Sequence, residues 1–332
     1  MKNNPNNIPG IGERRPFSFR SFFMHWEWIL VFLVIIVIII NSNITPYFLN
    51  VTNLFDMTFN FMELGIVVLI MSFIIIIGQM DLSVGSTMAL SSAVMGISYQ
   101  SGLNIWIAML LGIAAGTLGG FFNGIIIARV KIHSIIITLA TYSLYRGIAY
   151  ILLKDNAVTG YPPKFLYLGQ GYIGNSPVPL ELVIFAVLAI LFGFILHKST
   201  FGRYMYSIGN NELASRYSGI PVDRILITIY TSSGFMSAIA GVLFTFRVAV
   251  TRPNMAEAFL FEIITIVLLG GISIYGGEGS IIGVVLSLFL IGMIRRGMML
   301  VNISSEVMSV VIGCILIIAI LIPKALRRLV RE

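Results

Sequence analysis

The sequence predicts an all-α, polytopic membrane protein of about ten transmembrane helices, with one short helix that faces water. Of its 332 residues, 58% are hydrophobic and only 11% are charged. The mean hydropathy is +0.96, and apolar runs of about 20 residues, enough to cross a hydrocarbon layer, recur along the chain. This is not the composition of a soluble globular protein. Membrane orientation also explains the net charge of +7 without a nucleic-acid partner.

The predicted spans follow one another through mostly short connections. In order, they are residues 26–40, 60–77, 84–99, 105–128, 135–153, 180–196, 225–246, 260–274, 281–294 and 304–322. Basic residues precede the first span, but no small-residue cleavage site follows it, so we expect it to remain uncleaved. The chain therefore divides into an N-terminal segment (1–25), a transmembrane domain (26–323) and a C-terminal tail (324–332).

Lysines and arginines predict the orientation of these spans. If the N-terminus is cytoplasmic, most of the 21 basic residues fall in segments on that side, as the positive-inside rule requires. Both termini and the polar segment 201–224 are then cytoplasmic, and the main outer loop is 154–179. Arg295 and Arg296 are the exception, at the outer end of the ninth span. Either they line a polar cavity there, or the last helices have other bounds.

Residues 201–224, FGRYMYSIGNNELASRYSGIPVDR, form a polar, helix-competent segment in an otherwise almost continuously apolar chain. Either asparagine of the NN pair can cap a helix of about two turns, in which Glu212 and Arg216 stand four residues apart. A glycine and a proline then end the helix. So short a helix is not stable alone in water. We expect it to dock on a soluble partner; the alternative is that its arginines hold it on the inner lipid surface.

The string GQMDLSVGS (78–86) joins the second and third spans and places an acid beside apolar helices. Asp81 at bilayer depth would cost about 2.5 to 3.5 kcal/mol unless it is paired, capped or hydrated. Asp81 or Ser83 can accept from the first free backbone N–H groups of the next helix, and Gly78 and Gly85 allow a tight bend. Two interpretations stay open: a capped helix junction, or a gate or solute contact.

The fourth span carries a glycine at every fourth position, namely Gly112, Gly116, Gly120 and Gly124. Such a stripe lets a neighbouring helix approach closely and therefore predicts helix packing. Asn123, beside the stripe, can either hydrogen-bond across that interface or face a solute pathway.

A second break, GGISIYGGEGS (270–280), repeats the order of the first: an apolar helix, glycines, an acid and a serine that opens the next helix. This hints at two related halves. Other ionisable residues within or beside spans are functional candidates by default: Glu63, Arg146, Glu262, Glu278 and Glu306. A pair such as Glu63 with Arg146 could equally be structural.

The sequence lacks the residue patterns that nucleotide binding, metal binding and catalysis usually require. The chain has no G-x-x-x-x-G-K-[ST] loop, so ATP bound by such a loop would have to be in another subunit. The single cysteine, Cys314, lies in the last apolar run, where we expect it to be buried, and the three histidines lack metal-ligand spacing. With no Ser/His/Asp or Cys/His set, we expect no enzyme activity, metal or cofactor in this chain.

Three stretches, in this order, resemble motifs of one family. GQMDLSVGSTMALSSAVMG (78–96) is similar to the G-G-x-D-L-S-V-G-S motif of the permease subunits of ribose-, xylose-, rhamnose- and autoinducer-2-type ABC importers, with Gln79 where ribose-type members usually have glycine. FGRYMYSIGNNELASRYSGI (201–220) resembles their cytoplasmic coupling segment, and LLGGISIYGGEGSIIGVVLSLFLIGMIRRGM (268–298) resembles a third stretch. The likeness covers roughly residues 30–325.

This resemblance implies a permease subunit in a bacterial inner (plasma) membrane, with both termini cytoplasmic. It implies a second permease, ABC ATPase subunits that bind ATP and magnesium, and an external solute-binding protein that delivers a sugar. By position, the ATPase-coupling residues are Gly209, Asn210, Glu212, Ala214, Arg216 and Gly219. The first motif, Asp81, Ser83, Val84 and Gly85, is expected to shape the pathway or gate more than to touch sugar.

Other functions stay open beside this one. Within the importer class, autoinducer-2, nucleosides or branched-chain amino acids are alternative solutes. An ion-coupled secondary transporter would instead take up solute along a proton or sodium gradient without an ATPase. A membrane-bound enzyme would need a cluster of catalytic polar groups at one depth, which the sequence does not contain.

Overall fold

The computed structural model describes residues 26–154 and 156–329, with side chains described as far as residue 319. These residues form helices and two isolated β-bridges, Val158 with Thr251 and Tyr172 with Pro179. The helices are α2 (Trp26–Ile44), α3 (Val51–Asp56), η1 (Met57–Asn60), α4 (Met62–Ile76), α5 (Val84–Gln100), α6 (Ile105–Val130), α7 (Ser134–Leu153), α8 (Pro163–Gln170), α9 (Leu180–Lys198), α10 (Thr200–Asn210), α11 (Glu212–Tyr217), α12 (Val222–Val248), α13 (Phe259–Leu269), α14 (Ile281–Leu300) and α15 (Ser305–Leu329). The all-helical prediction is confirmed for this part of the chain. The N-terminal segment 1–25 lies outside it.

Six helices of the described chain are long and apolar enough to cross a membrane: α2, α6, α7, α9, α12 and α14. Residues 51–60 pass the same test together with α4, but the pair is bent by 58°. The remaining predicted spans correspond to α5, α13 and α15. The chain is therefore a multi-pass membrane protein.

Two predicted spans have the wrong bounds. The eighth was expected to reach residue 274, but α13 ends at Leu269. Two glycines follow it, and Gly271 adopts a φ of +86°, which favours glycine over other residues. The ninth was expected to end at residue 294, but α14 continues to Leu300 and includes both arginines within it.

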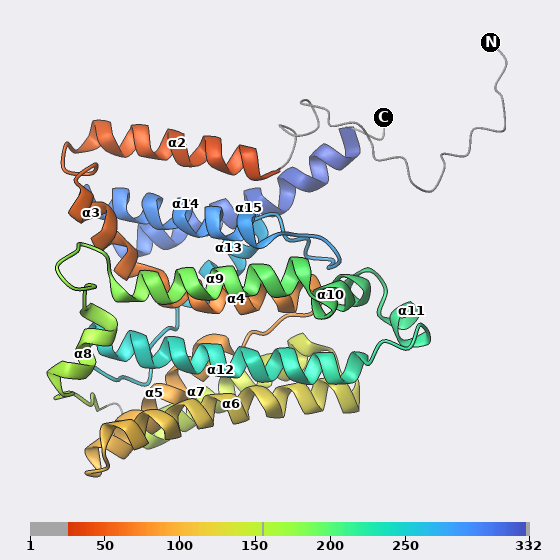
Figure 1. The fold of residues 1–332 in the computed structure, drawn as a ribbon, viewed down its shortest axis with the longest axis horizontal. Helices are drawn as coiled ribbons and strands as arrows, with labels where there is room; N and C mark the ends of the chain where they lie inside the picture. Colours follow the sequence, from red (N-terminus) through yellow and green to blue (C-terminus); the bar gives the residue numbers. More distant parts are fainter. Residues whose placement is uncertain (1–25, 155, 330–332) are drawn as a thin grey trace.

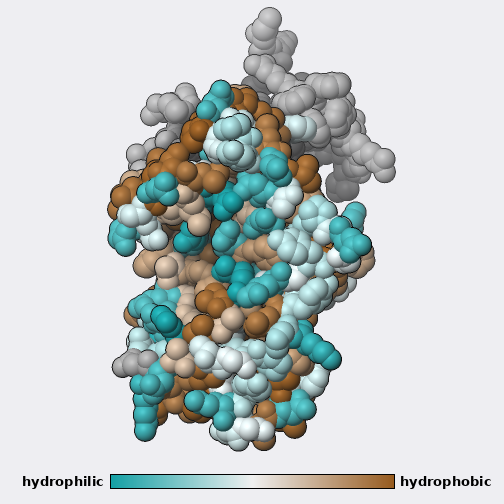
Figure 2. Space-filling model, turned by 90° about the vertical axis from the view of Figure 1, so that its left-hand side faces the viewer, coloured by the Kyte–Doolittle hydropathy of each residue, from teal (hydrophilic) through white to brown (hydrophobic). Residues whose placement is uncertain are grey.

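Most helices lie side by side along the long axis of the molecule (Figure 1). At one end, on the left in Figure 1, lie α3, α8 and the connection between α8 and α9; we call it the α8 end. At the opposite end α10 and α11 project beyond the bundle, and we call this the α11 end. Figure 2 looks onto the α8 end, where hydrophilic side chains gather in the middle of the face.

Two helices occupy the centre of the bundle. Every residue of α4 is buried, because α9, α12, α13 and α14 surround it. The next helix, α5, is buried along most of its length between α6, α7 and α12. A helix that is apolar all round is expected at such a position, with no face toward water. By contrast α2, which packs on α14, leaves most of its surface uncovered.

The glycine stripe of α6 faces its neighbours within the chain. A Cβ at Gly116 would lie 2.7 Å from the Cβ of Ala238, and one at Gly120 would lie 2.7 Å from the backbone nitrogen of Gly234, both on α12. A Cβ at Gly124 would meet Ile227 of the same helix at 3.0 Å, and one at Gly112 would meet Ser91 of α5 at 2.6 Å. Small residues allow this close approach of backbones.

The suggested pairing of Glu63 with Arg146 is wrong. Glu63, at the start of α4, forms an ion pair with Arg247 near the end of α12. Arg146 of α7 instead donates to the carbonyl oxygens of Pro253, at 2.6 Å, and Met255, at 2.8 Å. The local sequence gives no sign of these partners, because they lie on distant elements.

The two arginines that broke the charge pattern are both paired. Arg295 forms an ion pair of 2.7 Å with Glu262 of α13. The Nε atom of Arg296 donates to the side-chain oxygen of Asn53 on α3 at 3.1 Å. Cys314 is exposed and not buried as expected, since α15 packs mainly on α13 and covers only one of its sides.

Candidate functional site

The polar segment 201–224 folds as two helices, not as the single short helix expected. Ser199 caps α10 by accepting from the backbone N–H of Gly202 at 3.1 Å. The buried face of α10 carries Gly202, Met205 and Ile208. Asn211 then takes an extended conformation, with a φ of −161°, and separates α10 from α11. Only the amphipathic pattern of residues 200–210 indicated the first helix in the sequence.

One ion pair joins α11 to the helix that follows it, and a second lies within α11. Asn211 caps α11 by accepting from the backbone N–H of Ala214 at 2.9 Å. Arg216 pairs with Glu212 at 2.8 Å and with Asp223, at the start of α12, at 2.7 Å. Partial burial lowers the pKa of Arg216, but its hydrogen bonds to the two carboxylates raise it, with a net rise, so the guanidinium stays charged. Gly219, with a φ of +81°, makes the turn out of the helix.

The free surface of α11 is partly apolar. Leu213 is 63% exposed and Tyr217 is 84% exposed, and Ala214 lies exposed between them. Side chains three and four residues apart lie on one face of a helix, so these three form one apolar surface. We call it the α11 surface. An apolar surface held rigid at the projecting end of a membrane protein is suited to a protein partner.

The end of α10 touches both chain breaks. A Cβ at Gly209 would overlap the carbonyl oxygen of Ile76, at the end of α4, and the backbone nitrogen of Gly277. Gly277 donates its N–H to the same oxygen of Ile76 at 2.8 Å. A Cβ at Gly276 would lie 2.8 Å from the backbone nitrogen of Gly78. We call these five residues the glycine junction; it places the two breaks side by side beneath α10.

Two side chains of α10 brace the glycine junction. The hydroxyl of Tyr206 donates to the carbonyl oxygen of Gly279 at 2.7 Å. The side chain of Asn210 lies over Gly277 and donates to the carbonyl oxygen of Tyr206 at 2.8 Å. Movement of α10 would therefore act directly on the backbone of both breaks, since no flexible side chain separates them.

The acid of the first break is enclosed in a hydrogen-bond network. Asp81 is 2% exposed. One of its carboxylate oxygens accepts from the N–H of Ser83, at 2.9 Å, and from the Ser83 hydroxyl, at 2.6 Å, and the other accepts from Ser233 of α12 at 2.8 Å. Asn123 of α6 donates to the Ser83 hydroxyl at 2.9 Å and accepts from Tyr145 of α7 at 3.3 Å. We call this the Asp81 network.

The Asp81 network is a junction of four helices, α5, α6, α7 and α12. Asp81 closes a turn with Ser83 and does not reach the first N–H groups of α5, and Ser83 makes no capping bond of its own. Val84 is 1% exposed, and a Cβ at Gly85 would lie 2.7 Å from the carbonyl oxygen of Ala256. The side chains of this motif are thus buried against protein, which suits holding helices together better than touching a solute.

One polar stretch was overlooked in the sequence. Residues 249–258, between α12 and α13, place Arg252, Asn254 and Glu257 at the surface of a pocket of about 550 Å³. Its signal was available, because two charged residues and an asparagine interrupt two strongly apolar helices.

The sequence matches known transport proteins over most of its length. Residues 53–320 match the family described as the permease component of the branched-chain amino acid transport system. The chain is 36% identical over 291 residues to the ribose import permease protein RbsC of Bacillus subtilis (strain 168), covering 87% of this chain and 90% of that protein. It is 35% identical over 301 residues to the autoinducer 2 import system permease protein LsrD of Escherichia coli (strain K12), covering 89% and 91%. No solved structure matches.

Proposed function

The chain belongs to the family of branched-chain amino acid transport system permease components, and on this premise we propose that it is the membrane-spanning permease subunit of an ATP-driven importer. Its solute is a monosaccharide or a related small sugar. Two relatives that cover most of the chain are named import permeases for ribose and for autoinducer 2. Their similarity to this chain is what favours a sugar-like solute over a nucleoside or a branched-chain amino acid. The predicted resemblance to sugar-type permeases is thereby confirmed.

The observation that carries this proposal is that α10 connects α11, with its exposed surface, to the two chain breaks of the bundle. Leu213 and Tyr217 are exposed on a short helix that one ion pair joins to α12. Immediately before it, α10 reaches both chain breaks through the glycine junction. A partner that binds α11 would therefore be connected, through α10, to the backbone of both chain breaks. We assign the partner as an ATPase subunit, because the sequence has no phosphate-binding loop of its own.

The remaining parts of the proposal follow from this assignment. The ten predicted spans cross the inner membrane of a bacterium, with both termini and the α11 end in the cytoplasm. Two ATPase subunits bind ATP and magnesium, a second permease completes the pathway, and an external binding protein delivers solute at the α8 end. ATP binding and hydrolysis move α10 and α11, and the helices tilt between outward-open and inward-open states.

Transport in a defined system tests the proposal. The chain is purified from its native membrane with the proteins bound to it, reconstituted into vesicles and supplied with radiolabelled ribose. Uptake is expected to need ATP inside the vesicles and the binding protein outside, and to be insensitive to proton and sodium ionophores. Uptake that follows an ion gradient without nucleotide would instead identify a secondary transporter. A cysteine placed at position 217 that reacts only from the outside of intact cells would also refute the assignment.

A further inference from the structure

The overlooked stretch 249–258 is a series of turns after α12 and has two different sides. After α12 ends, Thr251, Pro253 and Met255 are buried, whereas Arg252 and Asn254 between them are exposed. One side is therefore packed on the protein, and the other, which continues to the exposed Glu257, is free.

This stretch runs from the α8 end into the interior of the bundle. A Cβ at Gly96 of α5 would lie 3.2 Å from the side chain of Thr251, and one at Gly85 would lie 2.7 Å from the carbonyl oxygen of Ala256. At 1.5 Å per residue, these two glycines are about 16 Å apart along α5. Arg252, Asn254 and Glu257 are thus distributed over a large part of the depth of the membrane domain, and α13 starts inside it.

The buried side of the stretch is firmly anchored. The Arg146 guanidinium donates to the carbonyl oxygens of Pro253 and Met255. Thr251 pairs with Val158 through backbone hydrogen bonds of 2.9 and 3.1 Å, and its hydroxyl lies 2.7 Å from that of Tyr161. Charge-assisted hydrogen bonds to the backbone are among the strong ones. The three polar side chains on the other side therefore project from a fixed support.

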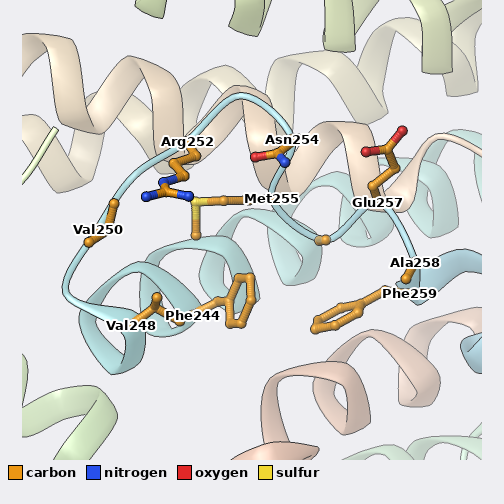
Figure 3. Close-up of a pocket in the computed structure, with 10 residues that line it drawn as sticks. Phe244, Val248, Val250, Arg252, Asn254, Met255, Glu257, Ala258 and Phe259 are labelled. Atoms are coloured by element: carbon orange, nitrogen blue, oxygen red, sulfur yellow. The ribbon is translucent and has the colours of Figure 1, made fainter. Parts of the chain in front are cut away.

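The free side lines the pocket of about 550 Å³. Figure 3 shows the stretch arching over it, with the rings of Phe244 from α12 and Phe259 from α13 beneath. The centroids of these two rings are 5.2 Å apart. The volume is within the range of small-molecule sites. Polar side chains at such depth are costly toward lipid, so they should line a water-filled cavity.

We propose that this pocket is a subsite of the translocation pathway that binds a neutral, polyhydroxylated solute. Arg252 supplies hydrogen-bond donors, Glu257 supplies acceptors and Asn254 supplies both. In the structure the three side chains are not hydrogen-bonded to other residues of the described chain. Phe244 and Phe259 offer apolar faces to the C–H groups of a ring. The inference rests on the proposed function. It adds which part of the chain the solute contacts on its way through the membrane.

Cysteine labelling tests whether the pocket is wet and whether it holds solute. The complete importer carries Asn254→Cys in a Cys314→Ser background and is treated with a charged methanethiosulfonate, both without nucleotide and with a non-hydrolysable ATP analogue. Phe194→Cys is the matched control, because that side chain is 64% exposed on the outer side of α9 and should face lipid. We expect position 254 to react at least tenfold faster than position 194 in one of the two states. Ribose, at millimolar concentration, should slow this reaction at least threefold, and leucine should not.

Each other outcome would overturn the inference. If position 254 reacts no faster than position 194 in either state, the pocket is not part of an aqueous pathway. If it reacts but ribose gives no protection, the pocket is wet without being a solute site. If leucine protects and ribose does not, the solute class is wrong.

Uptake kinetics separate this inference from the proposed function. In the reconstituted importer, Asn254→Leu should raise the solute concentration for half-maximal uptake at least fivefold, and Asn254→Gln should restore most of the loss. ATP hydrolysis by the bound ATPase subunits and the amount of assembled complex should be unchanged. If the wild-type importer transports ribose with ATP and Asn254→Leu behaves in the same way, the proposed function stands and the subsite is wrong. If the wild type shows no ATP-driven uptake, the proposed function itself has failed.

Discussion

The Asp81 network and the stretch 249–258 both place polar residues in the membrane domain. Those of the network are buried and hydrogen-bonded, whereas those of the stretch are exposed. Asp81 is 2% exposed and accepts three hydrogen bonds from two serines. Glu257, on the stretch that touches the same helix α5, is exposed toward a pocket. A carboxylate whose oxygens are hydrogen-bonded within the protein joins helices, whereas one without such hydrogen bonds is available to a ligand. An acid in an apolar segment can therefore have either role. Its hydrogen-bond partners and its exposure distinguish a structural residue from a candidate residue of the solute pathway.

Removing the carboxylate of the Asp81 network should have the largest effect. Asp81→Ala leaves buried donors on Ser83 and Ser233 without an acceptor, which costs about 3 kcal/mol or more. We expect a strongly reduced yield of monodisperse protein and a midpoint of thermal unfolding lowered by many degrees, measured by size-exclusion chromatography of detergent-solubilised protein. Asp81→Asn, which keeps one acceptor oxygen, should be milder. A fully stable Asp81→Ala protein would contradict the structural role.

The glycine stripe of α6, like the Asp81 network, should contribute to stability. Gly116→Leu would force a side chain into Ala238 on α12, and overpacking of this kind costs about 1–3 kcal/mol or more. Gly193→Leu is a matched control, because no heavy atom lies within 4 Å of a Cβ at that position of α9. Only the first variant should lower the midpoint of thermal unfolding. Equal midpoints for the two variants would mean that α6 does not need this close contact.

Loosening the ion pairs of α11 should reduce transport without affecting insertion. Glu212→Ala with Arg216→Ala removes the pair within α11 and the pair from Arg216 to Asp223. These pairs are partly exposed, so each is worth about 1 kcal/mol or less. We expect a several-fold loss of uptake and of ATPase stimulation at a normal level of membrane protein. Ser218→Ala, at the end of the same helix, is the control. Unchanged uptake in the double variant would remove the docking assignment.

The smallest effect on stability is expected at the pocket. Glu257→Gln changes a side chain that is exposed, and such substitutions usually alter the free energy of unfolding by about 0.5 kcal/mol or less. Its uptake of ribose should nevertheless fall, because one acceptor for solute hydroxyls is lost. The measurement is uptake per assembled complex together with the unfolding midpoint. A large drop in the midpoint would show that Glu257 is structural, and the contrast with Asp81 would then disappear.

Local patterns in the sequence were enough to predict most helices. The starts at residues 84, 105, 180 and 281 agree with the structure, because apolar runs begin there, and at two of them the preceding residue caps the helix. Asn104 accepts from Trp106 at 2.9 Å, and Ser280 accepts from Gly283 at 3.3 Å, as caps do. The residues that end α13 early were also visible in the sequence, as a pair of glycines.

Contacts between distant segments could not be predicted in the same way. The ion pair of Glu63 with Arg247 joins residues that are 184 positions apart, and the glycine junction joins three separate segments. The sequence showed Gly209 as a motif residue but not which backbone it approaches. The first helix of the polar segment, α10, was missed because one extended residue, Asn211, separates two runs that both favour helix. Tertiary packing decides such features, and no single-segment pattern contains it.

The glycine junction has a consequence for how this permease can change over evolutionary time. It consists of backbone atoms and glycines, so under the proposed function it would carry no information about which ATPase binds at Leu213 and Tyr217. If an ATPase binds at the α11 surface, its recognition and the transmission of its movement would be encoded in different residues a few positions apart. A lineage could then exchange one ATPase for another by altering the surface of a single helical turn, with no change to the residues inside the membrane.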